Sequence, residues 1–278
     1  NFRVVSKEIS KLEKKPANNN PSLFSDTGYC LFEDVLTPAE TLQARQMLDQ
    51  ALFEPLPPPQ GRNDSLDRDG YVGEPHVRDL RWLELCRHPR ILDAVESVLG
   101  PNLVLVFSSV FIKLPHSPVK VGWHQDNTYW PSVHGTEVIT LWLAIDDADA
   151  SNSAMKVIPG SHIDWAELDT VPAADNEMLT RNVPVTTEQE NSAVTLEMSA
   201  GSLSIHDSFI LHGSDKNKTD RRRAGHTIRY CSTDTAWVDL EAHPNPVFVV
   251  RGQAGTRGDS YVSLHPDVNA TKELLHKS

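Results

Sequence analysis

The sequence predicts a mainly β protein, a β-sandwich or jelly roll with helices packed outside one sheet. Two stretches with helical patterning, residues 34–52 and 79–99, come first in the chain. After residue 102 the pattern changes to about eight short β-prone runs separated by turn residues. The composition, with 39% hydrophobic and 23% charged residues, is typical of a folded globular protein.

The chain divides into three parts. Residues 1–22 are a polar leader rich in Lys, Asn and Pro, and residues 23–251 are expected to form one domain. A length of 278 residues is sufficient for one large domain with a sizeable core. The tail, residues 252–278, is expected to be irregular apart from a helical patch at 272–276.

The helices are predicted from the signals at their ends. Thr37 is a suitable N-cap, Pro38 follows at the first helical position and Glu40 supplies a carboxylate at the third. In the second helical stretch, Pro89 is expected to divide the helix, and Gly100 ends it.

A long connection, residues 54–74, lies between the two helical stretches. Its many Pro and Gly residues argue against any regular element, and a connection of this length is typical of a lid. The β-prone runs that follow are residues 103–114, 119–123, 138–145, 154–158, 193–198, 202–206, 227–232 and 247–250.

Charge, cysteine content and hydropathy exclude several classes of protein. The formal net charge of -12 repels nucleic acids and anionic lipids, so we expect neither as a partner. Three widely spaced cysteines without a CxxC motif predict neither a disulfide framework nor a thiolate zinc site, which favours a cytoplasmic location. No apolar run approaches the roughly 20 residues needed to cross a bilayer, so we expect no membrane span.

A histidine and an aspartate two positions apart are the first candidates for chemistry. His124 and Asp126 lie on a strand-like run, where a spacing of two places both side chains on one face. A nitrogen ligand from a distant strand would complete a 2-His-1-carboxylate triad, which leaves iron positions free for a cosubstrate and O₂. His212, at the end of an apolar run, is the best candidate for the third ligand, and His206 is its nearest rival on spacing alone.

Basic residues follow the distal histidine at a useful distance. Arg221, Arg222 and Arg223 precede a β-prone stretch at residues 224–231. An arginine that enters the barrel at this point can bind the far end of a dicarboxylate through a bidentate fork.

Four motifs in order resemble the phytanoyl-CoA dioxygenase (PhyH) family of iron(II)- and 2-oxoglutarate-dependent oxygenases. They are the WHQDNTYWP block at residues 123–131, TLWLAID at 140–146, MKVIPGSH at 155–162, and HGS at 212–214 with Asn217, Arg223 and Tyr230. The resemblance implies a double-stranded β-helix (a cupin-like jelly roll), iron(II), 2-oxoglutarate as cosubstrate and O₂. It also implies that ascorbate is a useful additive in vitro.

The resemblance also implies roles for individual residues. His124, Asp126 and His212 match the iron ligands of the family, and Arg223 matches the arginine that binds the C5 carboxylate of 2-oxoglutarate. Further cosubstrate contacts expected from the family pattern are Ser214, Lys113, Thr140 and Trp142.

The substrate pocket is predicted less directly. Tyr129 and Trp130 follow the metal-binding motif and are expected to belong partly to the pocket and partly to the core. His134, Trp237 and Tyr71, the last in the expected lid loop, are further candidates.

The expected reaction is hydroxylation of an unactivated C–H bond in a small-molecule metabolite, with release of succinate and CO₂, and the expected setting is secondary metabolism or catabolism. Asp126 argues against halogenation, because halogenating relatives lack the carboxylate ligand; desaturation, epoxidation and ring formation stay open. The acidic composition gives little support for an acyl-CoA substrate and equally favours a neutral or cationic metabolite. A cupin-type metalloenzyme that does not use 2-oxoglutarate and a non-catalytic binding module are the alternatives. The protein is expected to be a monomer or a homodimer.

Overall fold

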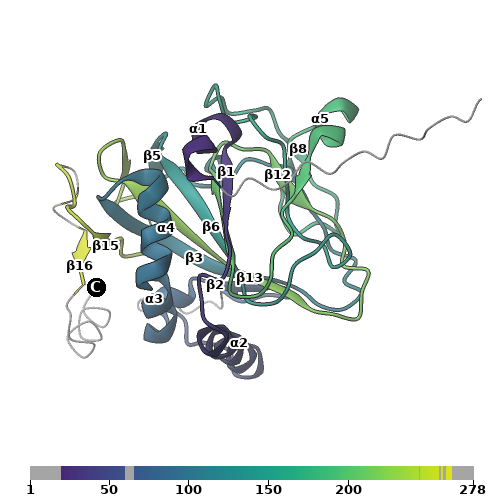
Figure 1. The fold of residues 1–278 in the computed structure, drawn as a ribbon, viewed down its shortest axis with the longest axis horizontal. Coiled ribbons are helices and arrows are strands. Elements are labelled where there is room, and N and C mark those ends of the chain that lie inside the picture. The colour runs from purple at the N-terminus through teal and green to yellow at the C-terminus, as the bar shows by residue number, and fades with distance from the viewer. Residues whose placement is uncertain (1–19, 60–65, 244, 257, 259–260, 265–278) are drawn as a thin grey trace, which may run out of the picture.

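Two facing β-sheets with helices on the outer side of the larger sheet make up the fold (Figure 1). The computed structural model describes residues 20–59, 66–243, 245–256, 258 and 261–264. The predicted mainly β architecture with flanking helices is confirmed. Within these ranges no helix is long and apolar enough to cross a membrane.

The larger sheet has eight strands, and most of its pairings are antiparallel. Its order is β1 (Tyr29–Phe32), β11 (Leu203–Asp207), β6 (Val138–Ala144), β13 (Arg223–Ser232), β3 (Leu103–Lys113), β15 (Phe248–Arg251) and β16 (Val262–Ser263), with β2 (Tyr71–Gly73) also paired to β3.

The smaller sheet faces the inner side of the larger sheet (Figure 1). Its order is β10 (Val194–Thr195), β7 (Lys156–Val157), β12 (His212–Ser214) and β4 (Val121–His124). Two further pairs stand apart from these sheets, β5 (Val133–Gly135) with β14 (Ala236–Val238) and β8 (Val171–Pro172) with β9 (Arg181–Asn182).

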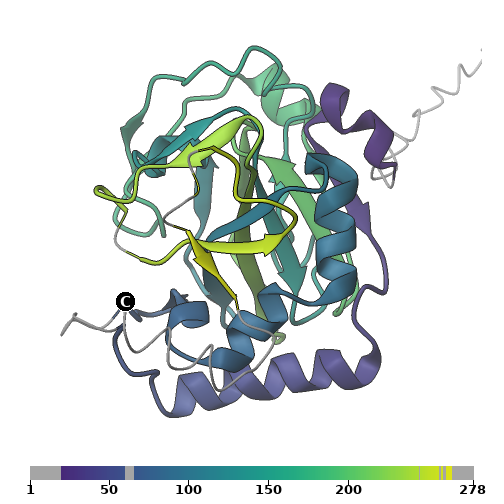
Figure 2. The same cartoon turned by 90° about the vertical axis from the view of Figure 1, so that its left-hand side faces the viewer.

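Helices α2 (Pro38–Phe53), α3 (Leu80–Cys86) and α4 (Pro89–Leu99) pack around the larger sheet, as Figure 2 shows from a second side. The predicted capping box at the start of α2 is present, since Thr37 and Glu40 bond to each other's backbone N–H groups. Pro89 divides the second helical stretch into α3 and α4, as predicted. The remaining helices are short, α1 (Phe24–Thr27), α5 (Thr187–Ser192) and the 3₁₀ turns Pro21–Leu23, Pro75–Val77 and Asn127–Tyr129.

The main hydrophobic core lies between these helices and the outer face of the larger sheet. It contains side chains of α3 and α4 such as Leu83, Ile91 and Val95, packed against Leu141 and Ile228 of the sheet. Residues that alternate with the core residues point to the inner face, toward the smaller sheet. The core therefore fixes which side chains can face the space between the sheets.

Several short strands lie outside the predicted β-prone runs, among them β1, β5, β8, β9 and β14, and two more fall in segments that were expected to hold no regular element. The predicted loop at 54–74 contains β2, which pairs with β3 through Val72 and Val110, and the tail contains β16, which pairs in parallel with β15. Strands of two or three residues have too few alternating positions to be recognised, and the edge of a neighbouring strand decides whether they form. The helical patch predicted at 272–276 lies outside the described residues.

Candidate active site

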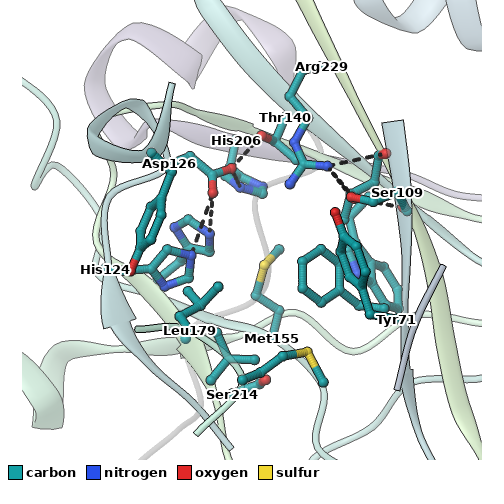
Figure 3. Close-up of a pocket in the computed structure, with 18 of the residues that line it drawn as sticks. Tyr71, Ser109, His124, Asp126, Thr140, Met155, Leu179, His206, Ser214 and Arg229 are labelled. Carbon is teal, nitrogen blue, oxygen red and sulfur yellow. Dashed lines mark hydrogen bonds and ion pairs between the residues drawn. The ribbon is translucent and has the colours of Figure 1, made fainter. Parts of the chain in front are cut away.

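A cavity of about 280 Å³ lies between the two sheets (Figure 3). Its walls contain most of the candidates from the sequence: Tyr71, Lys113, His124, Asp126, Tyr129, Trp130, Thr140, Trp142, His212, Ser214 and Arg223. Residues from strands far apart in the chain are thus brought to one site.

His124, Asp126 and His212 form one group of potential metal ligands. One donor atom from each residue lies within 4.8 Å of the others, and all three side chains are buried. His124 Nε2 is 3.5 Å and His212 Nε2 is 3.7 Å from Asp126 Oδ1. Two imidazoles and one carboxylate at this spacing match the facial triad of non-haem iron(II) oxygenases.

Strand pairing positions the two histidines. In the smaller sheet His212 of β12 lies opposite His124 of β4, and their ring centroids are 4.0 Å apart. The next residue, Gly213, has room only for a hydrogen, because an added Cβ would lie 2.9 Å from the Val121 carbonyl oxygen. The glycine therefore allows the two strands to approach closely beside the metal group.

Each histidine is held in the tautomer that suits a metal ligand. His124 Nδ1 lies 2.9 Å from the Gly122 carbonyl and His212 Nδ1 lies 3.0 Å from that of Ile210, so Nδ1–H donates and Nε2 keeps its lone pair. Burial, followed by the neighbouring His124, lowers the pKa of His212 well below its usual range. The imidazole is then neutral, as metal binding requires.

Asp126 is held as a carboxylate. Burial alone would raise its pKa, but the nearby His212 and a hydrogen bond to His124 outweigh this effect and keep the pKa well below its usual range. Thr140 Oγ1 donates a hydrogen bond to Asp126 Oδ2, which leaves Oδ1 toward the histidines. The sequence placed Thr140 against the cosubstrate, whereas its hydrogen bond in the structure is to the carboxylate of the triad.

His206, the rival third ligand, lies behind the triad. Its Nε2 is 3.5 Å from Asp126 Oδ2, and neither of its ring nitrogens has a hydrogen-bond partner. The group of donor atoms that converge contains His212 and not His206. The geometry therefore favours His212 as the third ligand.

Two buried cations line the same cavity away from the triad. Arg223 of β13 lies opposite Lys113 of β3, and both side chains are almost fully buried. Arg223 donates from Nε and Nη2 to the Ser153 carbonyl, at 2.9 and 2.6 Å. Lys113 Nζ donates to Ser214 Oγ at 2.8 Å and to Ser153 Oγ at 2.9 Å. Among the described residues neither cation has a carboxylate within ion-pair distance, so their charges are available to an anionic ligand.

Burial, followed by the charge of Arg223, lowers the pKa of Lys113 to about 6. Burial also lowers the pKa of Arg223 to about 10. An anion bound between them would reverse both effects. Arg223 packs against the ring of Trp142, with the guanidinium carbon 5.3 Å from the ring centroid. The chemistry of these groups fits one carboxylate of a dicarboxylate cosubstrate.

Two pocket candidates lie elsewhere. His134 of β5 and Trp237 of β14 stack on each other, with ring centroids 4.3 Å apart, and neither lines the cavity. The two residues face each other across a strand pair, and that pairing could not be read from either segment alone.

Other residues of the cavity were not predicted. The most important is Arg229, which is buried on β13. The cavity is also lined by Ser109, Thr227, Phe107 and Phe111. The signal that could have found Arg229 is the period of two that runs from Arg223 through Gly225 and Thr227 along one strand.

The fold and the site together define a class, the 2-oxoglutarate-dependent non-haem iron oxygenases. The model of the phytanoyl-CoA dioxygenase (PhyH) family matches residues 24–225, and the chain belongs to this family. The resemblance read from the four sequence motifs is thereby confirmed.

The sequence identities between this chain and individual relatives are low. Peroxisomal phytanoyl-CoA dioxygenase of Bos taurus is 22% identical over 233 residues, which cover 78% of this chain and 69% of that protein. The non-haem monooxygenase ThoJ in its apo form shares 24% identity, with a TM-score of 0.71 and 92% of each chain covered. The epimerase SnoN, solved with Fe³⁺, α-ketoglutarate and nogalamycin RO, shares 21% identity with a TM-score of 0.62, covering 90% of this chain and 95% of that one. These solved structures confirm the double-stranded β-helix fold.

Proposed function

We propose that this protein is an iron(II)- and 2-oxoglutarate-dependent dioxygenase that hydroxylates an unactivated C–H bond of a small-molecule metabolite. The observation that carries the proposal is a single cavity with a His-Asp-His group in one part and two buried cations without carboxylate partners in another. One part suits a metal ion and the other suits the distal carboxylate of the cosubstrate.

His124, Asp126 and His212 would hold the iron. With iron and 2-oxoglutarate bound, O₂ would be the oxidant: one of its oxygen atoms enters succinate as 2-oxoglutarate loses CO₂, and the other enters the hydroxylated product. The chain itself contributes orientation: backbone carbonyls fix both imidazoles, and the Thr140 hydroxyl fixes the carboxylate.

Arg223, Lys113 and Ser214 would bind the C5 carboxylate of 2-oxoglutarate. Arg223 Nη1 has no hydrogen-bond partner among the described residues and can donate to a ligand. The cavity is also lined by aromatic and aliphatic side chains such as Phe107, Trp130 and Leu179, against which an apolar substrate can pack.

The test is a comparison of succinate release and metal binding in matched variants. We expect the wild type with iron(II), ascorbate and 2-oxoglutarate to form succinate, and Asp126→Ala or Arg223→Ala to reduce this at least about 100-fold. Arg221→Ala is the control, since Arg221 is half exposed and pairs with Asp149 on the surface. Failure of the wild type to bind iron or 2-oxoglutarate would refute the proposal.

Two experimental results would change the proposed reaction. Unchanged turnover of a substrate by Arg223→Ala would favour a cupin-type metalloenzyme that does not use 2-oxoglutarate. A product that has lost two hydrogens, rather than gained one oxygen, would indicate desaturation or ring formation on the same site.

A reducing compartment such as the cytoplasm, a monomer or homodimer, and a role in secondary metabolism remain part of the proposal. The first is supported by Cys30, Cys86 and Cys231, which are all buried and unpaired. Cell fractionation would test the compartment, because the bovine relative is a peroxisomal enzyme.

A further inference from the structure

A second buried arginine faces the cavity near the metal group. Arg229 lies on β13, its side chain is buried, and it points into the cavity beside Asp126 and Thr140 (Figure 3). In the sheet register Arg229 lies opposite Thr140, whose hydroxyl binds Asp126. The guanidinium is therefore next to the proposed iron site, on the same strand as Arg223 but six residues further along.

The protein uses only one of the three nitrogens of the Arg229 guanidinium. Nη1 donates to Ser109 Oγ at 2.8 Å, to Thr227 Oγ1 and to the Thr227 carbonyl at 3.4 Å, whereas Nε is buried without a partner. Nη2 likewise has no hydrogen-bond partner among the described residues. A buried guanidinium with unused donors is costly unless a ligand completes it.

No carboxylate of the described residues forms an ion pair with Arg229. The nearest acidic group that acts on it is Asp126, which the metal would engage. With 2-oxoglutarate bound beside it, Lys113 is protonated, so the buried positive charges are two from iron and one each from Lys113, Arg223 and Arg229. The negative charges are one from Asp126 and two from 2-oxoglutarate. Two positive charges are left without a counterion at side chains that are almost fully buried.

Two aromatic rings pack against the guanidinium of Arg229. The guanidinium carbon lies 4.9 Å from the centroid of Phe107 and 5.6 Å from that of Trp130. Beyond Phe107, Tyr71 and Phe111 meet edge to face at 5.1 Å. The cavity volume of about 280 Å³, which must also hold 2-oxoglutarate, is small compared with the roughly 300–1,000 Å³ of common ligand sites.

We propose that Arg229, supported by Ser109 and Thr227, binds the carboxylate of the substrate, which is a small organic acid with an apolar or aromatic body. The inference rests on the proposed function and adds the substrate class to it. Because Arg229 lies beside the triad, the carbons close to the carboxylate face the iron, and the far end of the apolar body lies toward Phe111 and Tyr71. An acidic substrate differs from the neutral or cationic metabolite that the net charge of the chain led us to expect.

The competing role for Arg229 is a contact to the C1 carboxylate of 2-oxoglutarate. The two roles differ in a measurable way, since one changes the affinity for the cosubstrate and the other changes the preference for acids over neutral isosteres. A merely structural role would change neither and would lower only the melting temperature.

The experiment uses protein loaded with Co(II), which does not turn over, and 2-oxoglutarate. Calorimetry then measures the binding of phenylacetate, benzoate and hexanoate, each against its own amide. In the wild type we expect at least one acid to bind about 10-fold more tightly than its amide, the factor of one charge-assisted pair.

Arg229→Met is expected to abolish this preference while the Kd for 2-oxoglutarate stays within about twofold of the wild type, a change too small for a lost charge-assisted pair. Arg229→Lys, which keeps the charge, should retain part of the preference and guards against misfolding of the Met variant. Arg181→Met is the matched control: Arg181 also packs on an aromatic ring, 4.5 Å from the centroid of Tyr129, but does not line the cavity.

The results separate two kinds of failure. No binding of Co(II) or 2-oxoglutarate by the wild type would contradict the proposed function itself. Normal binding of both, with no acid preferred over its amide, would overturn the assignment of Arg229 alone. A rise of about 10-fold or more in the Kd for 2-oxoglutarate in Arg229→Met, with the acid preference intact, would assign the arginine to the cosubstrate instead.

Discussion

Replacing Thr140 by valine removes one hydroxyl group from beneath the metal site and keeps the shape of the side chain. Thr140 Oγ1 donates to Asp126 Oδ2 in a fully buried setting, and Asp126 Oδ1 faces the two histidines. A buried hydrogen bond to a charged group contributes about 1.5–3 kcal/mol. If the bond orients the carboxylate for iron, its loss should raise the Kd for iron(II) about 10- to 100-fold.

The assay is anaerobic titration with iron(II), or with Co(II) as a stable substitute, in competition with a chelator of known affinity. Thr41→Val is the control, because Thr41 is also buried but bonds to a backbone carbonyl in helix α2, far from the cavity. An unchanged Kd for the metal together with a weaker affinity for 2-oxoglutarate would refute this reasoning. It would instead support the contact to the cosubstrate that the sequence motif implied for Thr140.

Three further predictions follow from the cation pair and its support. Arg223→Gln should raise the Kd for 2-oxoglutarate at least about 10-fold while the Kd for Co(II) is unchanged, as calorimetry can show. The pKa of Lys113 is lowered to about 6, so between pH 6 and 10 the unfolded chain binds the extra proton and stability rises with pH. In urea titrations the free energy of unfolding of the ligand-free protein should therefore rise more steeply with pH than that of Lys113→Met, by up to about 1.4 kcal/mol per pH unit. Equal slopes for the two proteins would contradict the lowered pKa of Lys113. Gly225→Ala should destabilise the protein by about 1–3 kcal/mol in thermal or urea unfolding, because its Cβ would lie 2.0 Å from the Trp142 indole; an unchanged melting temperature would show that the ring moves freely.

Local signals in the sequence were sufficient for some parts of this site. The capping box of α2 and the division at Pro89 depend on neighbours along the chain, and both are present in the structure. The His124 and Asp126 pair depends only on the period of a strand. These features could be predicted because the interactions that create them act over a few residues.

Other parts depend on which strands pair and in which register. The place of Arg229 in the cavity is determined by Thr140 and Ser109, which lie on strands more than 80 residues away in the sequence. His134 and Trp237 were misplaced for the same reason, since only the pairing of β5 with β14 stacks them outside the cavity. Side-chain type alone does not say which face of a strand meets the cavity.

The central strand β13 has one consequence for how relatives of this protein could diverge. It carries Arg223 and Arg229 on the same face, with Lys113 and Thr140 on the strands beside them. Six residues of extended chain span roughly 20 Å, and a strand paired on both sides hardly stretches. The strand therefore holds the proposed cosubstrate residue Arg223 and the proposed substrate residue Arg229 at a fixed distance, and residue 229 can be exchanged without moving residue 223. New substrates would then be acquired at position 229 and its aromatic neighbours, while the oxidising machinery stays as it is.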